Sequence, residues 1–518
     1  MDLLRRGRGV EHEYILATDP PLGIDENVKR RELIAHAIEG LKKKGFLLSH
    51  VTWALKGENG NFEYENSIYK LWPFETQPPS VAENGMRIYE DSLHLEISTP
   101  IYTTPQDAVI YGKVSEYLAF LAAQEAEAII DRSKVYCYTS NLSLWKGKGG
   151  KYIAAACGTH SNTTVSRQAF NLSKIKEAQR ALIPYLVTRI ILTGSGGYVP
   201  CTLDKRGRTI TKFGSGSEES ESSSELVGEL TCFVISPRSH FVNCIASSDT
   251  TLKRGLFNLR DEPHANKDLY WRFHDINWEG IRSHLQIYLR DLLHTFVIAA
   301  FEHGYLHDAP ILSDPLGEMK RISMDTNLGW QVGIGDGRTA DAVQDILVGY
   351  YLRKIEVMLN DKSGSTENWR DFELLSKFLN TVAGRDLESL MYCLDWVTKL
   401  FLVDVCDNSL DRLAACHQFC LVDQSVIGAK EAGESLFDPN ESVSALTKWV
   451  PELTPEALSR SVKKGLSEPP TGTREEKRME LLKKKAGAPV QANWDLIIDE
   501  GGARVWLPEP LDPQSMSD

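Results

Sequence analysis

The sequence lacks the features that mark several large classes of protein. No window approaches the ~18–20 consecutive apolar residues needed to cross a bilayer, and residues 1–7 contain no apolar signal core. The 58 Lys and Arg are outnumbered by 71 Asp and Glu, so the net charge is -13 at pH 7. Binding along nucleic acid needs the opposite surplus, because phosphates must be neutralised. We therefore expect no membrane partner and no nucleic-acid partner.

Cysteine pairs that would indicate a metal or redox motif are also missing. The nine cysteines are scattered, and none forms a Cys-x-x-Cys pair. Cys416 and Cys420 flank His417 and would share one face of a helix, but buried thiols are more common than a metal site at such positions. Reduced cysteines are typical of cytosolic proteins, so we predict a cytoplasmic location.

The common glycine-rich signatures are absent as well. The Gly/Lys-rich turn at 146–151 lacks the Gly-Lys-Ser/Thr ending of a P-loop. No dinucleotide fingerprint follows the first predicted strand, and no Gly-x-Ser-x-Gly elbow occurs. What is present is ample material for a large core, because 42% of the 518 residues are hydrophobic and 25% are charged.

Hydrophobic periodicity predicts a chain with both strands and helices. Strands are predicted at 9–17, 86–98, 229–237, 240–247 and 251–259, and helices at 28–44, 105–131 and 279–303, with mainly helical sequence over 340–425. Thr104 is the predicted N-cap of the second helix, and the stretch 174–194 predicts a helix followed by a strand. From about 430 the pattern changes to short helices and ends in a hairpin-like segment at 493–508.

Two predicted strands carry an unusual number of carboxylates. Glu11 and Glu13 are two residues apart and so share one face of the first strand. Arg87, Tyr89 and Asp91 share one face of the strand at 86–98. Carboxylates held close together repel unless cations offset them, and Mg²⁺ commonly bridges protein carboxylates and nucleotide phosphates. A solvated face of an edge strand is the simpler explanation, because Glu-x-Glu is common.

Histidine and arginine gather in two further segments. His160 follows a small turn in Gly-Thr-His-Ser-Asn, where it would ligate a metal, contact a phosphate or be merely structural. Arg254, Arg260 and His264 belong to a dense polar segment at 250–265, with Arg272 and His274 downstream. Arginine suits phosphate or carboxylate recognition because its planar fork makes paired hydrogen bonds. Surface ion pairs would account for the same composition.

Taken together and in this order, these segments resemble the Pup ligase and Pup deamidase family, the proteasome accessory factors. The matching pieces are GVEHEY at 9–14, NGMRIYEDSLHLEIST at 84–99, GTHSN at 158–162, TTLKRGLFNLRDEPHA at 250–265, PPTGTR at 469–474 and NWDLIID at 493–499. The resemblance implies an α+β fold with a glutamine-synthetase-like core, in which a curved antiparallel sheet packs against helices. It also implies a catalytic domain at 1–428, with an active-site loop at 55–83 and a flexible insert at 214–225, and a small C-terminal domain at 429–518.

The resemblance further implies ATP and Mg²⁺ as cofactors. Asp91 falls on the family's catalytic aspartate. The residues expected to bind magnesium are Glu11, Tyr89 and Glu96, with Glu13, His160 and His264 as further members of the metal shell. The residues expected to bind ATP are Arg87, Thr99 and Trp494, with Arg254 and Arg260 added from the arginine-rich segment.

Members of this family attach Pup to lysines or remove it, so the resemblance leaves more than one activity open. The long stretch from Tyr14 to Asn84 is typical of the deamidase branch. We therefore predict an ATP- and Mg²⁺-dependent amidohydrolase or isopeptidase that acts on the C-terminal Gln or Glu side-chain amide of a Pup-like tag. Its partners would be the tag and tagged proteins, with a link to the proteasome pathway. The first alternative is a ligase that forms a Glu–Lys isopeptide bond through an acyl phosphate.

One departure from the family pattern supports a further alternative. Ser161 stands where the family usually has Glu after the histidine, which removes a carboxylate near the expected metals. A nucleotide-binding regulator that has lost catalysis would fit this change, whereas the retained Asp91 argues against it.

Overall fold

The computed structural model describes residues 3–19, 26–54, 79–130, 134–140, 142–146, 150–213, 225–427, 434–512 and 514. Most of the predicted active-site loop and all of the predicted flexible insert except Glu225 lie outside these residues. Both therefore stay predictions.

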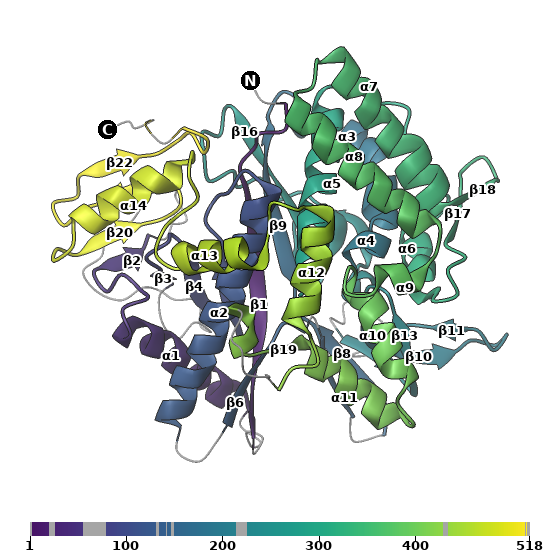
Figure 1. Cartoon of the computed structure of the whole chain (residues 1–518), viewed down its shortest axis with the longest axis horizontal. Helices are drawn as coiled ribbons and strands as arrows, with labels where there is room; N and C mark the ends of the chain where they lie inside the picture. The colour runs from purple at the N-terminus through teal and green to yellow at the C-terminus, as the bar shows by residue number, and fades with distance from the viewer. Residues whose placement is uncertain are drawn as a thin grey trace.

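An antiparallel sheet forms the centre of the molecule (Figure 1). Its strands lie in the order β16 (Tyr270–Trp278), β9 (Thr159–Ser166), β1 (Arg8–Asp19), β5 (His94–Ser98), β4 (Arg87–Asp91) and β3 (Ser80–Val81). The far half of β1 pairs with β6 (Lys134–Tyr138), which pairs in turn with β19 (Leu421–Val422). The long β1 thereby joins segments that are distant in the sequence.

Helices cover one face of this sheet. α2 (Pro105–Ile129) and α5 (His284–Glu302) pack together against the face to which Val10, Leu95 and Ile97 contribute buried side chains. Almost every residue of α5 is buried, so it is the central helix of the core. Thr104 is the N-cap of α2, as predicted, because its hydroxyl accepts a hydrogen bond from the Asp107 N–H at 3.1 Å.

The remaining helices surround this centre (Figure 1). They are α1 (Glu26–Lys43), α3 (Ile175–Thr188), α4 (Ile190–Thr193), α6 (Pro315–Met324), a π-helix (Ala342–Leu352), α7 (Arg353–Asp361), α8 (Thr366–Ala383), α9 (Leu387–Leu390), α10 (Asp395–Asp404), α11 (Ser409–Cys420), α12 (Pro439–Trp449), α13 (Pro455–Gly465) and α14 (Arg474–Lys484). The mainly helical character predicted for 340–425 is therefore confirmed.

Smaller sheets lie around the central one. Their strands are β10 (Gly197–Leu203), β11 (Thr209–Ile210) and β13 (Leu230–Val234); β7 (Leu142–Lys146), β8 (Tyr152–Ala156) and β12 (Glu225–Gly228); β14 (Cys244–Ser247) and β15 (Gly255–Asn258); β17 (Gln331–Gly333) and β18 (Thr339–Asp341); and β2 (Val51–Trp53), β20 (Val490–Ala492), β21 (Leu496–Ile498) and β22 (Arg504–Trp506).

The single strand predicted at 86–98 is wrong, because the segment is a hairpin. β4 ends at Asp91 and β5 begins at His94, and the turn between them places Ser92 and Leu93 at φ 51° and 73°. Positive φ at both central residues is the geometry that matches the twist of paired strands. The hairpin sets Tyr89 directly opposite Glu96.

Two other segment predictions also need correction. Residues 174–194 form α3 and α4, and the strand that was expected within them begins only at Gly197. The strand predicted at 240–247 is shorter, because Arg238–Phe241 form a 3-10 helix and β14 covers only Cys244–Ser247.

The helices and strands of the C-terminal region pack into two different hydrophobic clusters. Leu446 of α12 and Leu458 of α13 belong to the main hydrophobic core, whereas Met479 of α14 and Ile497 of β21 belong to a second cluster. β2, from the N-terminal part of the chain, pairs in parallel with β20 and joins that second cluster. The division at 428/429 stays a prediction.

Two sequence expectations concern the chain as a whole. No helix in the described parts of the chain is long and apolar enough to span a bilayer. Cys416 and Cys420 are buried free thiols, and with His417 they form no cluster of metal-ligating atoms among the described residues.

Candidate active site

The carboxylates predicted to act together lie on one face of the central sheet. Glu13 of β1 is directly opposite Glu96 of β5, which is itself opposite Tyr89 of β4. Glu11 is opposite His160 of β9 on its other side. Residues opposite one another on antiparallel strands point to the same face. The register therefore gathers side chains from four strands on the face that the helices leave open.

The first cluster consists of Glu13, Asp91 and Glu96, whose carboxylate oxygens lie within 4.8 Å of one another. The Tyr89 hydroxyl donates a hydrogen bond to Glu96, and the Gly158 N–H donates one to Glu13. Burial, and then the charge of Asp91, raise the pKa of Glu96 well above its usual value. One buried oxygen of Glu96 has no hydrogen-bond partner. This all-oxygen set fits a hard divalent cation such as Mg²⁺.

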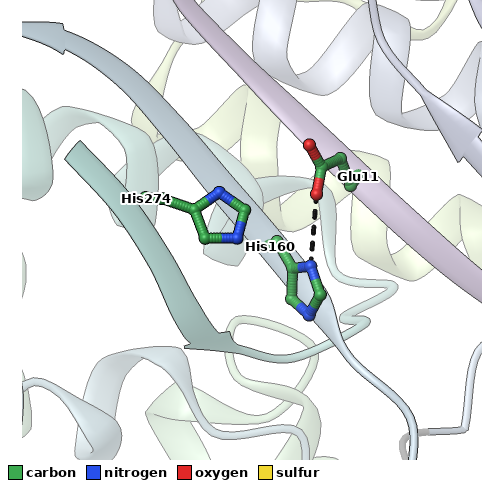
Figure 2. Close-up of side chains that lie close together, drawn as sticks. All are labelled: Glu11, His160 and His274. Atoms are coloured by element: carbon green, nitrogen blue, oxygen red, sulfur yellow. Dashed lines mark hydrogen bonds and ion pairs between the residues drawn. The ribbon is translucent and has the colours of Figure 1, made fainter. Parts of the chain in front are cut away.

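The second cluster consists of Glu11, His160 and His274, whose candidate ligand atoms also lie within 4.8 Å of one another (Figure 2). His160 Nδ1 is 3.2 Å from Glu11 Oε2. Burial alone would raise the pKa of Glu11, but the hydrogen bond with His160 and the charges of His274 and Arg272 outweigh it, so this pKa is well below its usual value. A carboxylate with two imidazoles also suits somewhat softer cations, such as Mn²⁺ or Zn²⁺.

A small cavity of about 60 Å³, partly open to solvent, lies beside the second cluster. Its wall includes, among other residues, Glu11, Thr99, Asn162, His264, Arg272, Arg474 and Trp494. Trp494 packs edge-on against Trp53, with ring centroids 5.1 Å apart. Concave, partly apolar sites with a few convergent charged groups are typical of small-molecule pockets. The arginines of its wall give the cavity the positive charge that an anionic ligand needs.

Most predicted site residues lie around the two clusters and the cavity. Glu11, Glu13, Asp91, Glu96 and His160 form the clusters, Tyr89 contacts Glu96, and Thr99, His264 and Trp494 line the cavity. The guanidinium of Arg87 lies over the rings of Tyr89 and Trp53, at 3.8 and 4.7 Å from their centroids. Arg87 therefore connects the carboxylate face to the aromatic wall of the cavity.

The two remaining arginines do not line this cavity. Arg254 donates hydrogen bonds to the Ala156 and Thr250 carbonyls at 3.2 and 3.3 Å, and burial together with Arg238 lowers its pKa to about 9. The negative charge of Glu13, a member of the first cluster, partly offsets this lowering of the Arg254 pKa. Arg260 is half-buried, and its charge acts on Arg272 and His274.

His274 occupies the position that sequence reasoning gave to His264. His264 belongs to neither cluster, and burial followed by the charge of Arg272 holds its pKa well below the usual range. His274, Asn162, Arg272 and Arg474 were missing from the predicted set. Arg272 and His274 are two apart in β16, so the alternation of that strand places both on the open face.

Ser161 lies on the opposite face from His160 and Asn162. It pairs with Val10 and Asp275, and all three residues are buried on the helix-covered side. A serine in place of the family's usual Glu at position 161 therefore removes no ligand from either cluster. The replacement gives no support to the alternative of a regulator that has lost catalysis.

Comparison with known proteins finds one family across nearly the whole chain. The Pup-ligase protein family model matches residues 6–498. The depupylase of Acidothermus cellulolyticus is 28% identical over 420 residues, covering 81% of this chain and 74% of that protein. The Pup deamidase/depupylase of Mycobacterium tuberculosis H37Rv is 28% identical over 441 residues (83% and 78%). The Pup–protein ligase of Acidimicrobium ferrooxidans is 26% identical over 429 residues (80% and 81%).

Two solved structures share the fold. The ligase PafA in complex with the prokaryotic ubiquitin-like protein Pup aligns with a TM-score of 0.69 at 20% identity, covering 99% of this chain and 91% of that one. PafA in complex with ADP aligns with a TM-score of 0.65 at 20% identity, covering 84% and 88%. The predicted α+β architecture, a curved antiparallel sheet packed with helices, is confirmed.

Proposed function

Because the chain belongs to the Pup-ligase protein family, we propose that it is an ATP- and Mg²⁺-dependent amidohydrolase that acts on the C-terminal side-chain amide of a Pup-like tag. The substrates would be a tag ending in glutamine and a tag joined through its C-terminal glutamate to a lysine of another protein. The proposal extends to a cytoplasmic setting and a link to the proteasome pathway.

One observation carries this proposal: the carboxylates of Glu13, Asp91 and Glu96 converge on the sheet face that also carries Glu11, and Glu11 lines the neighbouring cavity. Bound Mg²⁺ would neutralise phosphate charge and polarise the amide carbonyl. The proposed metal-binding residues are Tyr89 and the members of the two clusters other than Asp91. The proposed nucleotide-binding residues are Arg87, Thr99 and Trp494, with Arg272 and Arg474 added from the cavity wall.

Asp91 is the proposed catalytic residue. It lies at the end of β4 next to the turn and is half-buried, so a substrate reaches it more readily than the buried Glu96. A carboxylate in this position acts either as a nucleophile on the amide carbonyl or as a base on the attacking water.

Hydrolysis is favoured over ligation by the relatives. The depupylase and deamidase relatives are slightly more similar to this chain than the ligase relative over stretches of similar length. The long stretch between Tyr14 and Asn84 supports the same branch. Ligation stays the alternative, because relatives of both kinds share the fold and most of the chain.

The test is incubation of the purified protein with Mg²⁺-ATP and either glutamine-ended Pup or a Pup–lysine conjugate, followed by mass spectrometry. We expect glutamate-ended Pup and free lysine from the two substrates, and neither from Asp91→Asn. Glu90→Gln is the matched control, because Glu90 lies in the same strand but faces the helices. A new Pup–lysine bond formed with one ADP per bond would establish the ligase instead, and no product from any of these substrates would refute both.

A further inference from the structure

The side-chain amide of Asn162 contacts two members of the second cluster, Glu11 and His274. Its Nδ2 donates a hydrogen bond to Glu11 Oε1 at 3.0 Å. Its Oδ1 lies 3.0 Å from Arg272 Nη1 and 2.8 Å from His274 Nδ1. One amide thus contacts a carboxylate, a guanidinium and an imidazole. Asn162 belongs to β9, which lies between β1 and β16, and it is directly opposite His274 of β16.

The chemistry of two neighbours fixes which way the amide points. An ionised carboxylate only accepts hydrogen bonds and a guanidinium only donates them. The NH₂ group must therefore face Glu11 and the carbonyl oxygen must face Arg272. Turning the amide around would place two acceptors together at Glu11 and two donors together at Arg272, so only one orientation satisfies both.

This orientation determines the tautomer of His274. Because Oδ1 can only accept, the His274 nitrogen that lies 2.8 Å away must carry the hydrogen. A neutral imidazole protonated at Nδ1 has a bare lone pair at Nε2. Figure 2 shows the His274 ring turned toward Glu11 and His160, so the bare nitrogen is the one available to the cluster.

We propose that Asn162 is a positioning residue that holds His274 as the Nδ1–H tautomer and so presents Nε2 to a cation shared with Glu11 and His160. The proposal rests on the proposed function, because it concerns the cation that would accompany the nucleotide. Partners that hold the second nitrogen of a ligating histidine fix its ring and raise its basicity, and losing them typically costs ~10–100-fold in metal affinity. Arg272 supports this role by holding Oδ1 from the other side.

The experiment uses the full chain without nucleotide, Mn²⁺ alone as the probe, and the variants Asn162→Leu and Asn162→Asp. Leu matches the size of Asn but removes the acceptor for His274. Asp keeps that acceptor, but it replaces the donor to Glu11 with a second carboxylate, whose negative charge also attracts cations. Nitrogen NMR of the histidine side chains reports the tautomer, with His274→Gln identifying the signal, and titration calorimetry reports Mn²⁺ affinity.

We expect Asn162→Leu to lose the Nδ1–H preference of His274 and to bind Mn²⁺ ~10–100-fold more weakly. Asn162→Asp should retain the tautomer and bind Mn²⁺ more tightly than the Leu variant. Asn162→Ser, whose short side chain cannot reach both partners, repeats the test should the Leu variant not fold. It should behave like Leu.

An unchanged His274 tautomer with unchanged Mn²⁺ affinity in the Leu or Ser variant would overturn the proposal. Weaker ATP binding alone, without either change, would assign Asn162 to the nucleotide and would overturn it as well. Neither readout involves Pup turnover. A wild-type protein inactive on Pup but with the expected Mn²⁺ and NMR results would therefore refute the proposed function and leave this inference standing.

Discussion

Replacing Glu96 by Gln should change stability in opposite directions with and without magnesium. Glu96 is buried, and its carboxylate lies within 4.8 Å of those of Glu13 and Asp91. If both groups were ionised, two charges at this distance would repel by about 3 kcal/mol at an effective dielectric constant of ~20. This repulsion adds to burial in raising the pKa of Glu96, so without a cation the wild-type cluster must either bear the repulsion or bind a proton. Gln keeps the shape and still accepts the hydrogen bond from Tyr89. Without a divalent cation, the variant should be at least as stable as wild type, and about 1–2 kcal/mol more stable once solvent relieves part of the repulsion.

A bound cation should reverse the order of stability of wild type and Glu96→Gln. A ligand present at 100 times its dissociation constant stabilises the folded state by ~2.7 kcal/mol. Wild type should gain this amount from Mg²⁺-ATP, whereas Glu96→Gln should gain much less because the cluster has lost a charged ligand. The apparent melting temperatures of the two proteins should therefore cross between buffer with EDTA and buffer with Mg²⁺-ATP.

Thermal denaturation of both proteins in both buffers measures the crossing. Glu90→Gln is the control, because Glu90 accepts a hydrogen bond from the Leu93 N–H at 2.9 Å on the other face. That variant should lose stability equally in both buffers and keep the full gain from Mg²⁺-ATP. Equal destabilisation of Glu96→Gln in both buffers would refute the reasoning, because it would mean that Glu96 supports the fold and holds no cation.

Three further predictions follow from other residues. Ser161→Glu should destabilise the protein by at least ~2 kcal/mol without tightening Mn²⁺ binding, because the new carboxylate would be buried opposite Asp275; tighter Mn²⁺ binding in calorimetry would contradict this. Burial raises the pKa of Glu279 from 4.5 to about 7, so its contribution to stability is complete below pH 4.5 and is lost as the pH rises through about 7. Glu279→Gln should remove this dependence, which amounts to about 3 kcal/mol at ~1.4 kcal/mol per pKa unit. Urea denaturation at pH 5 and pH 8 gives the free energy of unfolding at each pH, and a difference between the two that is the same in the variant as in wild type would disprove the prediction. Trp494→Leu should weaken Mg²⁺-ATP binding ~10–100-fold, as expected for loss of an aromatic surface under a base, whereas Trp506→Leu, outside the cavity wall, should not.

Local sequence patterns located the acidic residues but not the geometry between them. Glu11 and Glu13 alternate within one strand, so their shared face could be predicted from spacing alone. The β4–β5 turn could not, because Ser92 and Leu93 adopt positive φ without the Gly or Asn that usually indicates such a turn. The alternation of 86–98 continues across them and is typical of one long strand.

Long-range pairing explains the other misses. His274 reaches the site because β16 pairs with β9, which brings it to a residue 112 positions away in the sequence. Nothing local distinguishes it from His264, which also lies in a polar segment. The same register decides that Ser161 faces the helices, so the meaning of that substitution depends on a pairing that the sequence does not display. The resemblance identified Trp494, whereas Arg474 became evident only from the cavity wall.

Turnover of glutamine-ended Pup in water enriched in a heavy oxygen isotope, with ATP supplied below the substrate concentration, tests the central claim most directly. The account predicts that all the glutamine becomes glutamate carrying one oxygen from water, without matching consumption of ATP, and that Asp91→Asn abolishes the conversion. Conversion that stops when the ATP is spent, or an undiminished rate in Asp91→Asn, would contradict it.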